Sequence, residues 1–243
     1  MNKFIRRIRD HFLRDILNHL YDLDAAVHVL TTDPAYDHEA QLGFNQIESR
    51  RTMFEELIKL VDFDRFVETG TFLGHSTGYL AQTTGKPIFS VEYNYRLFRL
   101  AKMRLKKIQN ISMHNMDSRA FLKEMIQNPE ITNSRTFFYL DAHWGKDVPL
   151  KEEIEMIFEN FEKFFILIDD FEVATDPNYI HDGYGTLKNI DFESLKNKFP
   201  LQAYYPSASA KEGDRMVTGY LALTDDHKDF KVLENFTHLK RFS

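Results

Sequence analysis

From about Phe66 onward, short runs of β-branched and aromatic residues alternate with helical patterns of apolar residues. The candidate strands are RFVET (65–69), PIFSVE (87–92), ISMHNM (111–116), TFFYLD (136–141) and FFILID (164–169). The segments with a helical pattern between them are STGYLAQTT (76–84), YRLFRLAKMRLKKI (95–108), SRAFLKEMIQ (118–127) and LKEEIEMIFENFEK (150–163). This alternation predicts a parallel sheet with helices on both faces.

The pattern changes after the fifth candidate strand. Residues 173–185, VATDPNYIHDGYG, collect Pro, Gly, Asp and Asn and predict a loop, and residues 186–199 predict one more helix. Two β-like runs, LQAYYPS (201–207) and VTGYLALT (217–224), follow and are joined by a polar stretch, as in an antiparallel hairpin. We therefore expect an α/β fold: a Rossmann-like, doubly wound, mostly parallel seven-stranded sheet with a C-terminal antiparallel hairpin.

The chain before Phe63 carries helical patterns, of which ESRRTMFEELIKLV (48–61) is the clearest. We predict an N-terminal helical cap over residues 1–62, with substrate or oligomer contacts, and a core domain over residues 63–243. The first helix is basic and amphipathic, a pattern that also fits an anionic membrane surface or pairing with another subunit in a homo-oligomer. Docking of this helix on its own domain is the more ordinary interpretation.

Composition and charge narrow the classes of function. The formal net charge is −6 and the sequence pI is near 5.9, so the field that attracts nucleic-acid phosphates is missing and we expect no nucleic-acid partner. The absence of cysteine excludes disulfides, thiolate nucleophiles and cysteine-based zinc sites, so any metal must use oxygen or imidazole ligands. Because no apolar run approaches ~20 residues and no signal-peptide core follows the basic start, we expect a cytoplasmic protein without a transmembrane segment.

In a doubly wound sheet, ligands collect at the carboxyl ends of the strands, where the strand order reverses. The first candidate strand ends in VETGTFLGHST, where Glu68 leads into Gly70 and Gly74. Glycines there let the backbone approach a ligand closely before the next helix begins. The spacing E-x-G-x-x-x-G differs from the dinucleotide fingerprint G-x-G-x-x-G and lacks the G-K-[ST] of a P-loop. A strand-to-helix turn often needs glycine, so this loop alone identifies no cofactor.

The next two strand ends also carry polar residues. Glu92 ends the second strand 24 residues after Glu68, near the ~20-residue offset expected of a carboxylate that accepts the hydroxyl protons of a ribose. Asp117 and Ser118 end the third strand and suit an adenine amino group. Each of these two residues is equally suited to capping the helix that begins there.

Together these strand ends resemble the class I S-adenosylmethionine-dependent methyltransferases, over most of the chain after Phe66. In that family an acidic residue and glycines after the first strand hold the methionine end of the cofactor. An acidic residue after the second strand holds the ribose, and a polar pair after the third meets the adenine. The closing hairpin also looks like that family's reversed last strand. The resemblance implies S-adenosylmethionine as cofactor, bound by Glu68, Thr69, Gly70, Gly74, Ser76, Glu92, Tyr93, Asp117, Ser118 and Asp141.

A second set of polar residues follows the fourth and fifth candidate strands. FFYLDAHW places Asp141, His143 and Trp144 at the rim of the sheet, and LIDDF brings Asp169 and Asp170 to the same rim. Converging carboxylates repel one another unless a cation or raised pKa values relieve the repulsion. Oxygen ligands of this kind suit Mg²⁺.

This second set resembles the metal-dependent O-methyltransferases, especially the macrocin-type sugar enzymes and, more distantly, catechol O-methyltransferase. The resemblance implies Asp141, Asp169 and Asp170 as ligands of Mg²⁺ or a similar divalent cation. A cation bound to two neighbouring substrate oxygens lowers a hydroxyl pKa and orients the oxygen for in-line attack on the methyl group. His143, whose unperturbed pKa is near ~6.5, is a candidate catalytic base beside Asp141, and it is also suited to binding substrate or hydrogen-bonding Asp170.

The sequence therefore predicts an enzyme that transfers a methyl group from S-adenosylmethionine to a hydroxyl of a small molecule, such as a sugar, polyol or natural product, with Mg²⁺ assistance. The alternatives are a metal-independent methyltransferase of the same fold and a nucleotide- or NAD-binding Rossmann-like protein without methyl transfer. Further side chains are candidates for the walls of the pocket, with packing or a solvated turn as the alternative for each. They are Trp144, Tyr179 and Tyr184, and the polar His75, His181 and Asp182.

Overall fold

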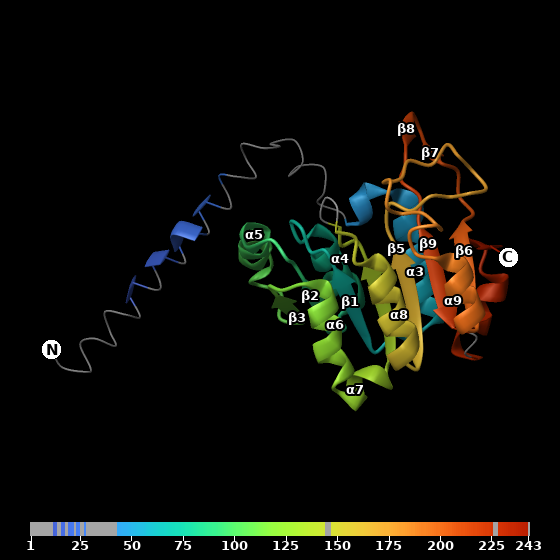
Figure 1. The fold of residues 1–243 in the computed structure, drawn as a ribbon. Helices are drawn as coiled ribbons and strands as arrows, with labels where there is room; N and C mark the ends of the chain where they lie inside the picture. The colour runs from blue at the N-terminus through green and yellow to red at the C-terminus, as the bar shows by residue number, and fades with distance from the viewer. Residues whose placement is uncertain are drawn as a thin grey trace.

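The computed structural model describes residues 43–143, 147–225 and 228–242, together with ten helical positions between Phe12 and Val27. Figure 1 labels the helices and strands along the ribbon. In chain order these elements are η1 (Phe44–Gln46), α3 (Glu48–Leu60), β1 (Arg65–Thr69), α4 (His75–Thr84), β2 (Ile88–Val91), α5 (Tyr95–Leu105), β3 (Ile111–His114), α6 (Ser118–Ile126), α7 (Pro129–Thr132), β4 (Arg135–Leu140), α8 (Leu150–Asn160), β5 (Lys163–Ile168), α9 (Phe192–Lys198), β6 (Leu201–Pro206), β7 (Lys211–Glu212), β8 (Arg215–Met216), β9 (Leu221–Asp225), η2 (Lys228–Asn235) and β10 (Leu239–Phe242).

One eight-stranded sheet runs through the described chain in the order β10-β6-β9-β5-β4-β1-β2-β3. Strands β1 to β5 pair in parallel, while β9 is antiparallel to both β5 and β6. The predicted mostly parallel, doubly wound sheet with C-terminal antiparallel strands is confirmed, whereas the predicted number of seven strands is one too low. Strand β10, with the sequence LKRF, adds an eighth strand at the edge, antiparallel to β6. Strand β10 is hard to predict from the sequence, because a short charged edge strand lacks the apolar run that marks a central strand.

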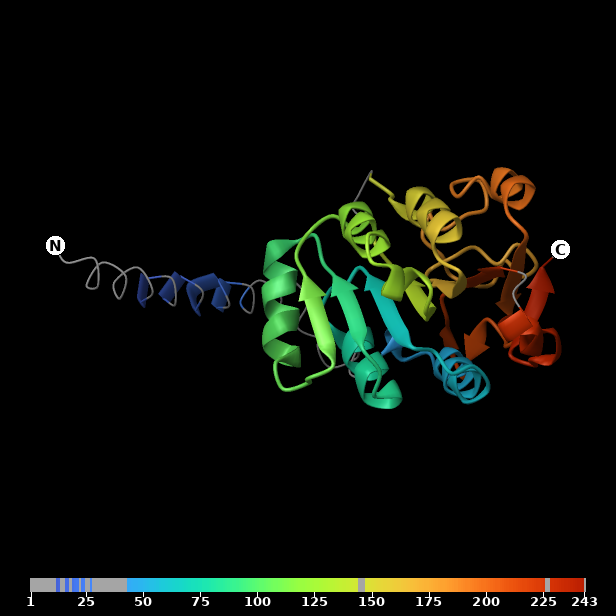
Figure 2. The same ribbon diagram turned by 90° about the horizontal axis from the view of Figure 1, so that it is seen from below.

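Each central strand sends its side chains alternately to two apolar layers. On β1, for example, Phe66 packs in the layer with α3, α4 and η2, whereas Val67 packs in the layer with α6, α8 and α9. Figure 2 shows these two helical layers on opposite sides of the sheet. Strands β4 and β5 are buried on both faces, which explains their nearly continuous apolar sequences.

The strand order reverses between β1 and β4, which are neighbours in the sheet although β2 follows β1 in the chain. In such a sheet the helices after neighbouring strands leave toward opposite faces and open a crevice at the carboxyl ends of the strands. The polar residues that follow β1, β2, β4 and β5 therefore meet at one rim of the sheet.

The N-terminal region is described from Gly43 onward and at the ten earlier helical positions. Helix α3 buries Met53, Phe54 and Leu57 against the core, so this part of the expected cap belongs to a layer of the core sheet. The earlier helical positions contact α5, through a Tyr21–Tyr95 ring pair and a salt bridge between Asp24 and Arg96. Among the helices that the structure describes, none has the length and apolar content that crossing a bilayer requires.

Candidate active site

A cavity of about 370 Å³ lies at the carboxyl ends of the parallel strands, a volume suited to a small molecule. Its described lining includes five carboxylates and two histidines and no lysine or arginine. The carboxylates are Glu68, Glu92, Asp141, Asp170 and Asp182, and the histidines are His75 and His143. The cavity is therefore suited to cations and to hydrogen-bond donors.

Glu68 comes from the end of β1 and is 1% exposed. Its Oε2 accepts hydrogen bonds from the hydroxyls of Thr77 and Ser90, and Ser90 in turn is bonded to Thr71. Its Oε1 has no protein partner and belongs to the lining of the cavity. Burial raises the pKa of Glu68 to about 7, because the site desolvates the charged form. A ligand amine is the kind of group that would satisfy the second oxygen.

The loop after β1 depends on glycine at its first turn. Gly70 has a φ of 85°, and a Cβ atom on it would lie 2.3 Å from the carbonyl oxygen of Asp141. Only glycine fits this contact between the loop and the end of β4. The loop therefore approaches the strand end that carries Asp141.

Glu92, after β2, accepts hydrogen bonds from the backbone N–H groups of Phe72, at 2.8 Å, and Asn94, at 2.7 Å. The whole residue is 1% exposed, and burial raises the pKa of Glu92 to about 7. Each of its oxygens keeps a free lone pair beside the cavity, the arrangement needed to accept a pair of hydroxyl protons.

Asp117 and Ser118 line a second, smaller cavity together with Tyr93, and Gly70 lines both cavities. Asp117 also caps α6, accepting from the N–H groups of Arg119 and Ala120, so the capping interpretation is correct for this residue. The guanidinium of Arg119 lowers the pKa of Asp117 by hydrogen bonding to it. Because capping keeps Asp117 at the rim of the sheet, it is compatible with the expected contact between Asp117 and an adenine.

Two further residues expected to bind the cofactor, Ser76 and Thr69, differ in position: only Ser76 lines one of these cavities. Ser76 lines the main cavity, and its Oγ accepts a hydrogen bond from the N–H of Phe44. Thr69 is fully buried and lines neither cavity; its side chain faces Glu153 of α8. The alternation of β1 explains this, because Glu68 and Thr69 point to opposite faces of the sheet.

A left-handed turn over residues 43–46 forms the N-terminal wall of the cavity. Gly43, Phe44, Asn45 and Gln46 all have positive φ, between 49° and 68°, which costs roughly 1–2 kcal/mol for each non-glycine residue. Phe44 anchors the turn in the core with its ring, and Arg215 donates to the carbonyl of Asn45 at 3.0 Å. The turn thereby presents the Asn45 side chain to the cavity.

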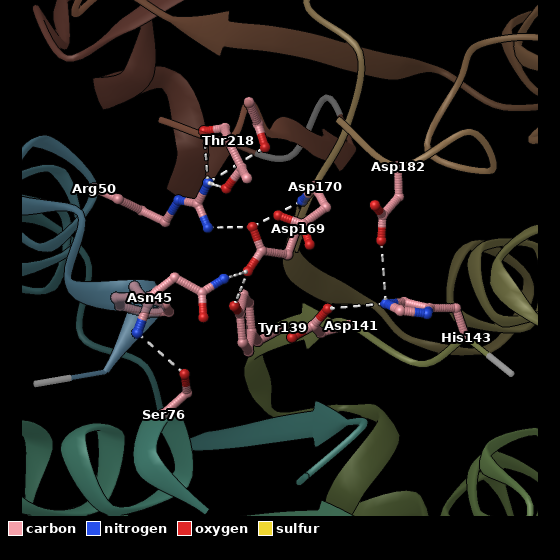
Figure 3. Close-up of polar contacts among 12 residues, drawn as sticks. Asn45, Arg50, Ser76, Tyr139, Asp141, His143, Asp169, Asp170, Asp182 and Thr218 are labelled. Carbon is pink, nitrogen blue, oxygen red and sulfur yellow. Dashed lines mark hydrogen bonds and ion pairs between the residues drawn. The ribbon is translucent and has the colours of Figure 1, made fainter. Parts of the chain in front are cut away.

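Asp169 has hydrogen-bond partners on both oxygens. Arg50 and the N–H of Asp170 donate to Oδ1, and the Tyr139 hydroxyl and the Asn45 amide donate to Oδ2 (Figure 3). Arg50 is 0% exposed and also donates to the Thr218 hydroxyl and carbonyl. The four lone-pair positions of the Asp169 carboxylate are therefore occupied by protein donors.

Asp170 has a different environment although it is the next residue. It adopts a φ of 48°, lines the cavity and keeps its Oδ1 buried without a protein partner. Burial and repulsion from Asp169 raise the pKa of Asp170, and the same two causes, with repulsion also from Asp170, raise that of Asp141. Asp141, His143 and Asp170 each offer one atom able to bind a metal ion, and these three atoms lie within 4.8 Å of one another.

The expected metal ligands are thus only partly brought together. The structure groups Asp141 and Asp170 at the cavity and adds His143 to them, while Asp169 lies behind them, bound to Arg50. The sequence pattern places all three aspartates at one rim but does not show which oxygens the protein itself occupies.

His143 is partly exposed and is surrounded by Tyr184 and Asp182 from the loop after β5. Asp182 lines the cavity, whereas the neighbouring His181 is exposed and lies outside the lining. Tyr184 meets His143 through its hydroxyl, and Tyr179 is buried with its hydroxyl 2.7 Å from the carbonyl of Ala208, a packing role. His75 also lines the cavity. Trp144 lies outside the described residues.

Arg50 and Asn45 belong to the N-terminal segment and are absent from the sequence-based site. A signal for Arg50 exists in the sequence, because residue 50 shares one face of α3 with the buried Met53, Phe54 and Leu57. A cation on an apolar helix face indicates a buried acidic partner. Asn45 has no comparable signal, since its role depends on the left-handed turn.

No family model and no curated protein matches this sequence. Solved structures match its fold. The O-methyltransferase TomG from Streptomyces achromogenes, involved in tomaymycin synthesis and solved with SAM, has a TM-score of 0.57 and 16% identity, covering 74% of this chain and 82% of that one. An O-methyltransferase from Bacillus cereus in complex with SAH has a TM-score of 0.58 and 15% identity, covering 84% and 91%. A putative O-methyltransferase from Klebsiella pneumoniae has 0.57 and 15%, covering 87% and 100%. This chain therefore has the class I methyltransferase fold.

Proposed function

We propose that this protein is an S-adenosylmethionine-dependent O-methyltransferase that acts on a small-molecule hydroxyl with the help of a divalent cation. The observation that carries the proposal is a single cavity with two acidic ends in a class I methyltransferase fold. Glu68 and Glu92 form one end, and Asp141, His143 and Asp170 form the other. Narrower assignment to macrocin-type sugar enzymes stays part of this proposal.

At the cofactor end, the free oxygen of Glu68 suits the amino group of the methionine moiety, and Glu92 suits the two ribose hydroxyls. Ser76 and the start of α4 face the same space, where a helix N-terminus favours a carboxylate. Asp117 and Ser118 in the adjoining small cavity would meet the adenine. The sulfonium charge would then lie near the acceptor-side carboxylates, which favour a cation.

At the acceptor end, the donor set fits a divalent ion. Asp170 has an unpartnered buried oxygen, and no lysine or arginine is in the described lining, so Arg50 behind Asp169 only partly offsets the repulsion among the carboxylates. Because Mg²⁺ takes oxygen ligands, often one or two carboxylates with substrate and water, Asp141 and Asp170 would hold it. We assign Asp169 to positioning, since its oxygens are occupied by Arg50, Tyr139 and Asn45. A bound ion would lower the pKa of an acceptor hydroxyl.

In the proposed reaction the acceptor oxygen attacks the methyl carbon in line with the breaking carbon–sulfur bond, giving a methyl ether and S-adenosylhomocysteine. His143 takes the hydroxyl proton at Nε2. Burial lowers the pKa of His143, so the imidazole is neutral and able to accept that proton near pH 7. The remaining task of the cavity is alignment of the oxygen with the methyl group.

The acceptor is proposed to be a neutral or cationic molecule with two neighbouring oxygens, such as a sugar or polyol. Vicinal oxygens can share one metal ion, which is the reason for this choice. The five carboxylates around the cavity disfavour acceptors that carry carboxylate or phosphate groups. The charge of the cavity therefore limits the acceptor more tightly than its volume does.

The proposal is tested by calorimetry with S-adenosylmethionine, S-adenosylhomocysteine and NAD, followed by a methyl-transfer assay on a panel of polyols and sugars. We expect binding of both S-adenosyl compounds and none of NAD, and transfer that EDTA abolishes and added Mg²⁺ restores. Tight NAD binding without S-adenosyl binding would overturn the proposal. Transfer that is insensitive to EDTA would remove the metal from it.

A further inference from the structure

The surroundings of His143 constrain where its proton lies. The hydroxyl of Tyr184 is within hydrogen-bond distance of His143 Nδ1 and lies 2.5 Å from Asp182 Oδ2. The two rings also pack against each other, with centroids 4.3 Å apart and planes inclined by 36°. His143 thus meets a tyrosine that is itself bound to a carboxylate.

The direction of these bonds follows from the chemistry of the three groups. An ionised carboxylate can only accept, so the single hydroxyl proton of Tyr184 goes to Asp182. The Tyr184 oxygen can then only accept from His143, which requires a proton on Nδ1. In a neutral imidazole that leaves the lone pair on Nε2.

We propose that Tyr184 and Asp182 are positioning residues that hold His143 as the Nδ1–H tautomer, with the Nε2 lone pair at the cavity on the side of Asp141. The consequence for methyl transfer rests on the proposed function, whereas the tautomer itself does not. Neither residue needs to touch the substrate for this role. The HDGYG segment (181–185) therefore supplies two residues, Asp182 and Tyr184, that orient His143.

The Nε2 side is open to this role. Nε2 lies 3.6 Å from Asp182 Oδ2 and 3.9 Å from Asp141 Oδ1, the two ion-pair contacts drawn as dashed lines in Figure 3. Both distances are beyond hydrogen-bond range. A carboxylate oxygen of Asp170 lies within 4.8 Å of a ring nitrogen of His143. The lone pair is thus near both carboxylates and bonded to neither, as a base or a ligand requires.

The loop that carries Tyr184 is fixed to the same strand end as Asp170. The N–H of Asp182 donates to the carbonyl of Asp170 at 3.0 Å, and the N–H of Glu172 donates to the carbonyl of Gly185 at 2.6 Å. A Cβ on Gly185 would lie 2.5 Å from the Asp170 carbonyl oxygen, so glycine is required for this approach. These backbone contacts therefore fix the positions of Asp182 and Tyr184 relative to Asp170.

The tautomer can be measured directly. In the full-length chain labelled with ¹⁵N-histidine, long-range proton–nitrogen spectra distinguish the two neutral tautomers, and His143→Gln identifies the signal among the ten histidines. At a pH where His143 is neutral, we expect the wild-type signal to report a proton on Nδ1. Tyr184→Phe removes the acceptor for that proton and should shift the population toward Nε2–H.

A second variant tests the direction of the relay. In Asp182→Asn, the amide can donate to the Tyr184 oxygen, so the tyrosine proton becomes available to His143 Nδ1 and the Nε2–H form should appear. The matched control is Tyr179→Phe, which removes another hydroxyl bond from the same loop without touching His143. The control should keep the wild-type tautomer.

If the chain transfers methyl groups, Tyr184→Phe should lower kcat about 10–100-fold, as loss of an orienting partner does, and leave KM for S-adenosylmethionine unchanged. A wild-type signal with the proton on Nε2, or a tautomer unaffected by both Tyr184→Phe and Asp182→Asn, would overturn the inference. A wild-type Nδ1–H signal that both variants shift, in a protein without methyl transfer, would support the inference while the proposed function failed.

Discussion

The two halves of the cavity neutralise buried carboxylates in different ways. In the half to which we assign the cofactor, built from Glu68, Glu92 and their loops, the partners are hydroxyl and backbone N–H groups within 22 residues along the chain. In the half to which we assign the acceptor, built from Asp141, His143 and Asp170 with Asp169 behind them, a guanidinium 119 residues away binds Asp169, and a tyrosine 41 residues away binds His143. We call these two parts the cofactor half and the acceptor half. The first half is assembled locally, and the second depends on the complete tertiary fold.

This difference has an energetic side. A buried carboxylate bound by neutral donors can accept a proton, as the raised pKa of Glu68 and Glu92 indicates, so its cost is limited. In a buried pair of a carboxylate with a guanidinium, the guanidinium cannot lose its charge, and removal of either partner leaves the other without its counter-charge in the core. The acceptor half is therefore the part of the site where single substitutions should have the larger effects.

The largest expected effect comes from Arg50→Met. Without its guanidinium, Asp169 is left buried and unpaired, and the free energy of unfolding should fall by about 3–5 kcal/mol. Denaturant unfolding measures this change. Asp169→Asn added to Arg50→Met should restore part of the loss, and Arg119→Met, which breaks partly exposed ion pairs, should cost less than about 1 kcal/mol. Equal losses in Arg50→Met and Arg119→Met would contradict the contrast between the halves.

Asp170→Asn separates the two halves functionally. Loss of one carboxylate at the unpartnered position should lower methyl transfer about 10²–10³-fold, equivalent to about 3–4 kcal/mol, because the cation loses a charged ligand. Affinity for S-adenosylhomocysteine should stay within about twofold, because the cofactor half is untouched. Rate assays and calorimetry on the same preparation give both numbers. An unchanged rate in Asp170→Asn would remove this residue from the cation site.

Glu153, beside Thr69 and Ser118, is a further buried carboxylate without a guanidinium partner in the described part of the chain, and its protonation can be tested by varying pH. It is 0% exposed, with the Thr69 and Ser118 hydroxyls beside it but neither oxygen in a hydrogen bond of normal geometry, and burial raises its pKa from 4.5 to about 7. The folded state keeps this proton to a higher pH than the unfolded state, so the contribution to stability is full below pH 4.5 and is lost as pH rises through about 7.

Glu153→Gln should therefore stabilise the protein at pH 8 relative to wild type, by at most about 3 kcal/mol, and change little at pH 4.5. The amide imitates the protonated acid, so no charge has to be desolvated. Denaturant midpoints at both pH values measure the effect. A uniform change at both pH values would show that the carboxyl stays ionised in the folded protein.

The smallest effect should come from Glu92→Gln. The amide oxygen still accepts one hydroxyl proton of a ribose, but the amide NH2 group accepts none and faces one of the two backbone N–H donors, so affinity for S-adenosylhomocysteine should fall about tenfold. Affinity for the cation should not change, because Glu92 is absent from the group of possible ligands among the described residues. Calorimetric titration with each ligand separates these outcomes. A larger loss of cation affinity than of cofactor affinity would place Glu92 in the other half.

The sequence predicts the sheet and the cofactor half because both depend on local patterns. Strands β4 and β5 are apolar runs of fixed length, and Glu68, Gly70 and Glu92 follow directly from where strands end. The acceptor half is predicted only as far as the same rule reaches, to Asp141, Asp169 and Asp170. The local rule cannot tell that both oxygens of Asp169 are bound by the protein whereas one oxygen of Asp170 is not.

What the sequence misses depends on contacts between distant segments. The left-handed turn that presents Asn45 is stabilised by Phe44 in the core and by Arg215 from the β7–β8 region, and no pattern near residue 45 indicates either. Tyr184 suggests an apolar wall by its residue type, but its hydroxyl meets His143, because Gly185 brings the loop against β5. These contacts follow from packing and not from periodicity.

The pair formed by Arg50 and Asp169 also has a consequence for the order of assembly. During synthesis Arg50 emerges 119 residues before Asp169, and 169 residues before Gly219, whose carbonyl it also binds. Until then its guanidinium has no place in the interior and has to stay hydrated. Helix α3 can therefore dock in its final position only after β5 and the segment before β9 have left the ribosome. The acceptor half is therefore closed by a segment that is synthesised before the residues that it binds.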